Sequence, residues 1–156
     1  YDPNYRPPLW RSQEEAAEGM KSVVSLVDVM KVSDEESLLL TGETTYEKAA
    51  LRLLAQGPKL VAVTLGGDGV LLVSKAHQEM IPAFRTEAVD TTGAGDIFGG
   101  SAMARLLELD KQVGELTEDD LKFIGSFAAT AASLSTEHSG GIPSIPEMDA
   151  VLKAMG

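Results

Sequence analysis

One short segment combines the residue types that could transfer a charged group. Gly93 and Gly95 flank a small Ala94, and Asp96 follows at once. If a helix begins there, its first backbone N–H groups point outward at the positive end of the helix dipole and can hold an anion. A carboxylate in the first turn can take a proton from an attacking hydroxyl. The segment therefore predicts phosphoryl transfer, with Asp96 as general base and residues 93–95 as the anion hole.

Common nucleotide-binding and hydrolase motifs do not account for this segment. The chain has no G-x-x-x-x-G-K-[ST] motif, and a G-x-G-x-x-G pattern fails because residue 98 is phenylalanine. A nucleophile elbow around Ser101 fails because the final glycine is absent. The remaining alternative is a tight strand-to-helix turn in which Asp96 only complements the helix dipole.

The composition restricts the ligands that the chain could bind. Its 156 residues are 44% hydrophobic and 24% charged, as in an ordinary globular domain. Because 24 Asp and Glu outnumber 13 Lys and Arg, the net charge is -11, and we expect no nucleic-acid or anionic-membrane partner. An anionic ligand must be held locally, by N–H groups, a cation or a few basic side chains. There is no cysteine, no apolar run of the roughly 18 residues that span a membrane, and no visible secretory signal, so we expect a cytoplasmic protein.

The elements that position this segment alternate between helical and extended patterns. Apolar spacing predicts helices over 13–27, 34–41, 46–56, 94–109 and 118–135 and after residue 146, and strands over 28–32, 60–65, 70–73, 78–82 and 84–88. Ser12 and Thr117 are expected N-caps, the latter with Asp120 in a capping box and with Leu116 and Leu121 as a hydrophobic staple. The order predicts an α/β fold with a largely parallel sheet. Residues 1–10 read as the carboxyl end of a strand that enters a loop.

Residues 90–96 (Asp-Thr-Thr-Gly-Ala-Gly-Asp) resemble the C-terminal signature of the ribokinase-like (PfkB) carbohydrate kinases. Residues 63–69 resemble that family's nucleotide-phosphate strand and turn, and residues 33–36 resemble its N-x-x-E segment, with Ser33 in place of Asn. Segments 2–6, 31–36 and 141–146 are most similar to fructokinases. The resemblance covers nearly all of residues 1–156 but only the C-terminal half of a typical member. We therefore expect the catalytic and nucleotide-binding part of a ribokinase-like domain, without its N-terminal half and lid.

The resemblance implies a three-layer α/β/α fold and an ATP-dependent sugar kinase. Asp96 would be the general base at the sugar hydroxyl, and Gly93, Ala94 and Gly95 would hold the γ-phosphate. The other implied site residues are Thr64, Gly66, Gly67 and Gly69 at the ATP phosphates, Ser33 near them, Ala128 and Ala132 at the adenine, Asn4 and Arg6 at the substrate or transferred phosphate, Glu36 ordering Mg²⁺, and Asp90, Thr92 and Ser144 at a K⁺ site.

Several readings of the whole protein stay open at this point. Fructose is the expected sugar, with 2-keto-3-deoxygluconate and ribose as alternatives. A second possibility is that residues 1–156 alone form a non-catalytic nucleotide-binding module. A truncated sheet exposes an edge and an apolar face, so we expect either a homodimer or association with the absent N-terminal half.

Overall fold

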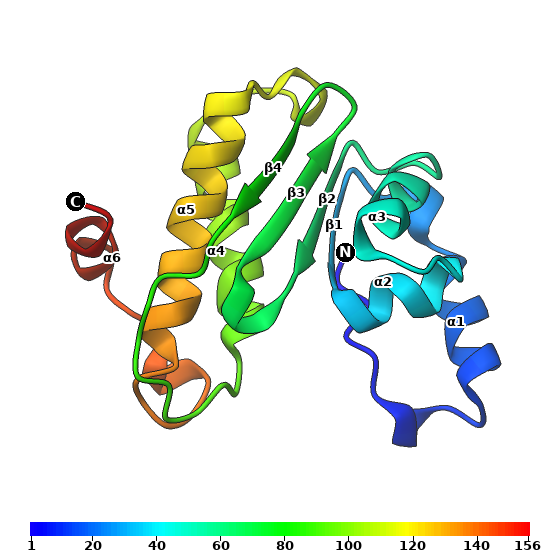
Figure 1. The fold of residues 1–156 in the computed structure, drawn as a ribbon, viewed down its shortest axis with the longest axis horizontal. Coiled ribbons are helices and arrows are strands. Elements are labelled where there is room, and N and C mark those ends of the chain that lie inside the picture. The colour runs from blue at the N-terminus through cyan, green and yellow to red at the C-terminus, as the bar shows by residue number, and fades with distance from the viewer.

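Two apolar strands joined by a tight turn form the centre of the sheet. In the computed structural model, which covers residues 1–156, Leu60–Thr64 (β2) and Val70–Ser74 (β3) are buried at their first four positions and pair antiparallel. Gln78–Ile81 (β4) extends this antiparallel pairing, whereas Val29–Ser33 (β1) pairs parallel with β2. The strand order is β1-β2-β3-β4 (Figure 1). The α/β class is confirmed, but the sheet is mixed rather than largely parallel.

Helices cover both faces of the sheet (Figure 1). One face packs against Gln13–Lys21 (α1), Asp34–Thr41 (α2) and Tyr46–Leu54 (α3), and the other against Ala94–Glu108 (α4) and Glu118–Ser135 (α5). Alternate residues of each strand enter the two cores: Val61 and Val63 face the first, and Leu60 and Ala62 face the second. Met148–Met155 (α6) lies outside this sandwich and packs on α5 through Val151.

Side-chain caps set several helix boundaries as the sequence predicted. Ser12 Oγ accepts the Glu15 N–H at 3.2 Å at the start of α1. Thr117 and Asp120 form the expected capping box at α5, and Leu116 and Leu121 are both buried in the core beneath it. These contacts fix where α1 and α5 begin.

Two predicted boundaries were wrong, each for a local reason. α1 ends at Lys21 instead of near residue 27, where three valines in five residues disfavour a helix. Residues 84–88 are not a strand, because Pro82 has no N–H to continue the β4 ladder. The chain instead crosses toward α4, and the N–H groups of Val89 and Asp90 both donate to Thr136 O.

The first residue extends the sheet beyond β1. The Tyr1 ammonium donates to Val29 O at 2.8 Å, and the Lys31 N–H donates to Tyr1 O at 2.9 Å. This alternation is the bonding pattern of a parallel neighbour, in agreement with the predicted strand end. No helix in the structure has the length and apolar character needed to cross a membrane.

Candidate active site

The N-terminus of α4 presents backbone N–H groups that nothing else in the chain uses. Gly93 is the N-cap with φ 80°, and no side chain caps the helix. The Ala94 N–H donates to Thr91 O at 3.2 Å, whereas the N–H groups of Gly95 and Asp96 have no acceptor within the chain. A Cβ at Gly93 would lie 3.0 Å from Gly141 Cα, so glycine is required here by φ and by space. The Gly93 N–H also has no acceptor within the chain, so Gly93 and Gly95 of the predicted 93–95 hole keep free donors, and Asp96 adds a third.

Asp96 stands beside these free donors with an unengaged carboxylate. Its side chain makes no hydrogen bond and no ion pair, and the residue is exposed. It lines two cavities: a mostly apolar one of about 260 Å³ beneath β1 and α4, and one of about 290 Å³ shared with Gly93, Gly141 and Ile142. A carboxylate in this position can accept a proton from a hydroxyl bound in either cavity.

A larger cavity of about 580 Å³ lies on the other side of the α4 N-terminus. It unites three predicted groups of residues: Thr64, Gly66, Gly67 and Gly69 from the β2–β3 connection, Ala94 and Gly95 from α4, and Ala132 from α5. Gly95 therefore stands in the wall of this cavity, next to Asp96, which faces the smaller cavities. A group bound at the free N–H donors can be reached from both sides.

One predicted wall residue lies elsewhere. Ala128 is fully buried in the core between α5 and the sheet and does not line the larger cavity. Ala129, Ser133 and Thr136 line it together with Ala132, because they occupy the adjacent face of α5. Arg85, which the sequence analysis did not single out, also lines this cavity.

Asp90 joins the loop before α4 to the loop after α5. Its Oδ1 accepts the Thr92 N–H and its Oδ2 accepts the Gly140 N–H, both at 2.9 Å. Hydrogen bonding from the Thr92 side chain, and from the N–H groups of Gly140 and Thr92, lowers the pKa of Asp90 to about 2. Ser144 is buried, and its hydroxyl donates to Gly141 O at 2.8 Å. The residues predicted for a monovalent cation thus lie on two loops that are held together beside Gly93.

Ser33 and Glu36 have a structural role that the sequence analysis missed. They form a capping box at α2: Ser33 Oγ accepts the Glu36 N–H, and Glu36 Oε2 accepts the Ser33 N–H at 2.8 Å. Glu36 Oε1 accepts the Tyr5 N–H at 2.6 Å. Neither residue lines a cavity described above, and no cluster of three or more His, Cys, Asp or Glu could hold a metal ion. Ser33 thus caps α2 and pairs in the sheet with Thr64, which lines the larger cavity, and Glu36 braces the N-terminal segment. Their roles at ATP and Mg²⁺ stay predictions.

Asn4 and Arg6 are not brought to Asp96 either. Both are exposed and line none of the three cavities. The Asn4 N–H donates to Asp2 Oδ1, and Arg6 Nη1 donates to Tyr5 O, each at 3.1 Å. In this arrangement neither side chain contacts the site.

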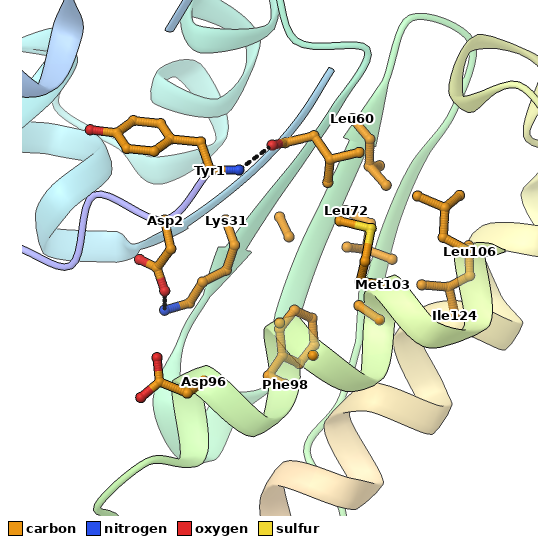
Figure 2. A pocket seen from close by; sticks show the side chains of 15 residues that line it. Tyr1, Asp2, Lys31, Leu60, Leu72, Asp96, Phe98, Met103, Leu106 and Ile124 are labelled. Carbon is orange, nitrogen blue, oxygen red and sulfur yellow. Dashed lines mark hydrogen bonds and ion pairs between the residues drawn. The ribbon is translucent and has the colours of Figure 1, made fainter. Parts of the chain in front are cut away.

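Lys31 is the residue that sequence reasoning overlooked at the site. Its Nζ lies 2.9 Å from Asp2 Oδ2. Figure 2 shows this pair and Asp96 at one end of the apolar cavity. The available signal was a lysine inside an otherwise apolar strand, on the face that packs toward α4.

The comparisons with known proteins agree with this fold and define the family. The pfkB family carbohydrate kinase model matches residues 1–148, so the chain belongs to that family. It is 38% identical to probable fructokinase-4 of Arabidopsis thaliana over 98% of the chain, and 38% identical to fructokinase-2 of Zea mays over 94%. It spans 48% and 43% of those two proteins, so about half the length of such relatives.

Solved structures show that the fold is ribokinase-like. The chain superposes with a TM-score of 0.89 on the fructokinase of Vibrio cholerae O395 in its fructose-, ADP- and calcium-bound form, at 28% identity, covering 99% of this chain and 49% of that one. The score is 0.83 for aminoimidazole riboside kinase of Salmonella enterica, complexed with aminoimidazole riboside and an ATP analog, at 27% identity, covering 99% of this chain and 51% of that one.

Proposed function

We propose that the protein carrying this chain transfers the γ-phosphoryl group of MgATP to a primary hydroxyl of a ketohexose, as a fructokinase. The observation that carries the proposal is the junction at Gly95 and Asp96. Two N–H groups without acceptors and a carboxylate without partners meet there, between the cavity of about 580 Å³ and the two smaller ones that Asp96 lines.

In this proposal each reactant binds on its own side of the junction. ATP would occupy the larger cavity, with its base near Ala132 and its phosphates along residues 66–69 and at the Gly95 N–H. The sugar would lie on the Asp96 side. Its hydroxyl oxygen forms the new bond to the γ-phosphorus, the bond to the bridging oxygen breaks with its electron pair leaving on ADP, and the hydroxyl proton passes to Asp96.

Cations would offset the acidic field of the chain. Bound Mg²⁺ supplies charge neutralisation at the ATP phosphates. In this chain Glu36 is already occupied by two N–H groups, so it would contribute through water at most. A K⁺ ion would be held by the loops that Asp90 and Ser144 stabilise, beside Gly93. Its charge there would support the anion site.

The fructokinase names of the plant relatives, and the fructose-bound Vibrio cholerae enzyme, favour fructose as the acceptor. Ribose and 2-keto-3-deoxygluconate are the alternative acceptors. A second candidate, for residues 1–156 taken alone, is a nucleotide-binding module that phosphorylates nothing. Its partner would then be a second copy or an N-terminal half of the same fold.

A coupled ADP-release assay with the three sugars tests the proposal, on residues 1–156 and on the longest natural protein that contains them. We expect D96N to lower kcat by roughly 10²–10⁴-fold while ATP still binds, because only the proton acceptor is lost. D149N is the matched control, since Asp149 is also a first-turn acid but lies on α6. Near-normal turnover by D96N would refute the role of Asp96. Activity of residues 1–156 alone would exclude the second candidate.

A further inference from the structure

Lys31 carries the positive charge on the acceptor side of the site. A Cβ built on Gly95 would lie 3.0 Å from Lys31 Nζ, so the ammonium rests against the backbone that holds the free N–H donors. The side chain is only 16% exposed and is fixed by Asp2 at 2.9 Å. In Figure 2 the ammonium lies between the carboxylates of Asp2 and Asp96. Lys31 makes no ion pair with Asp96.

The charged residues that line the cavities indicate what Lys31 could do. Arg85 and Lys31 are the only basic residues that line the three cavities, and Arg85 is on the side of the larger one. Asp96 and Asp2 would together repel a phosphoryl group that moves toward the acceptor. Lys31 is the one basic side chain on that side.

We propose that Lys31 is a catalytic residue that contacts the phosphoryl group during transfer, with Asp2 as the positioning residue that holds it. This inference rests on the proposed function and adds a residue to it. The N–H groups of Gly95 and Asp96 bind the phosphoryl oxygens from the helix side, and the Lys31 ammonium binds an oxygen from the β1 side. The negative charge on the transferred phosphoryl group is then stabilised by hydrogen-bond donors on both sides of Gly95.

The same arrangement explains why residue 95 is a glycine. At 3.0 Å from a built Cβ, the ammonium leaves no room for a side chain unless it moves. Glycine at 95 therefore lets the cation approach the helix N-terminus, in addition to exposing the N–H group. The short distance between β1 and α4 and the missing side chain at Gly95 are thus both needed to bring the ammonium to the helix N-terminus.

The test compares K31M with K59M in the longest natural protein. Methionine keeps the length and apolar stem of lysine and removes the charge. Lys59 is the matched control, because it also pairs with an aspartate, Asp28 at 2.7 Å, but lines none of the three cavities. We expect K31M to lower kcat by roughly 10²–10³-fold with fructose. K59M should retain wild-type kcat.

Binding separates this role from a structural one. By calorimetry with Mg²⁺, K31M should bind the non-hydrolysable analogue AMPPCP more weakly and ADP as well as wild type does. Equal loss for both nucleotides, loss for neither, or wild-type kcat would each overturn the assignment. K31Q, which keeps a donor to Asp2 without the charge, replaces K31M if that variant does not fold.

The two proposals can fail separately. If the wild-type protein binds nucleotides but phosphorylates no sugar, the proposed function fails, and the AMPPCP comparison still decides the role of Lys31. If turnover is normal and K31M matches wild type, only Lys31 is wrongly assigned. A wild-type protein that binds no nucleotide overturns both.

Discussion

The Gly140 N–H donates to Asp90 Oδ2 at 2.9 Å and so ties together two loops whose residues are 50 positions apart. The second carboxylate oxygen is taken by the Thr92 N–H. Together with the Val89 and Asp90 N–H bonds to Thr136 O, this side chain holds the α4 N-terminus beside the loop after α5. This is the link that brings Gly93 against Gly141.

D90N should weaken this link at both bonds. An asparagine keeps one acceptor oxygen but turns an NH₂ group toward the other N–H donor. We expect weaker nucleotide binding and a higher K⁺ requirement, measured by calorimetry and by activity against KCl concentration. D120N serves as the control, because Asp120 caps α5 away from the cavities. Equal effects of both variants on nucleotide affinity would argue against a local role for Asp90.

Acid should remove the contributions of both aspartates over a defined pH range. Hydrogen bonding lowers the pKa of Asp90 to about 2 from 3.8, and hydrogen bonding from the Lys111 side chain and from Thr117 does the same for Asp120. Because the folded pKa lies below the unfolded one, the stabilisation is complete above 3.8 and is lost as the pH falls toward 2. The difference in Tm between wild type and D120N should therefore shrink over this range. A difference that stays constant from pH 6 to pH 2 would contradict this linkage.

Local chemistry made most elements predictable. Ser12 and Thr117 marked helix starts because a hydroxyl N-cap acts within three residues, and the apolar run at 60–64 marked a buried strand. The signature at 93–96 located the segment that carries the free donors, because a helix N-terminus exposes them wherever it begins.

What escaped prediction depends on contacts between distant segments. The bond from the Tyr5 N–H to Glu36 Oε1 was not predicted, because no local spacing reveals a contact across 31 residues. The proximity of Lys31 to Gly95 was not predicted, because it arises only when β1 lies beside the first turn of α4. The antiparallel return of β3 along β2 was predicted from the turn at 66–69, and the structure confirms it, but the pairing of β4 with β3 was not predicted.

G69A should destabilise the fold while G67A should not. Gly69 has φ 113°, and a Cβ there would lie 2.0 Å from Ile81 O, whereas a Cβ at Gly67 meets nothing within 4 Å. The positive φ alone costs roughly 1–3 kcal/mol, and the clash adds to it. Urea unfolding followed by circular dichroism measures the two free energies. A G69A variant as stable as G67A would mean that the β2–β3 turn is placed wrongly.

E36Q separates the bracing role of Glu36 from a role in metal binding. Glutamine leaves one of the two N–H groups, from Ser33 or Tyr5, facing an NH₂ group in a site that is only 8% exposed. We expect a loss of about 1–3 kcal/mol in the free energy of unfolding. E35Q is the control, because Glu35 occupies the same helical turn with an exposed side chain and no partner. Titration of activity with Mg²⁺ completes the test. If E36Q kept the wild-type stability but needed much more Mg²⁺, Glu36 would act mainly at the metal. A carboxylate that only braces the N-terminal segment predicts a lower stability and an unchanged Mg²⁺ requirement.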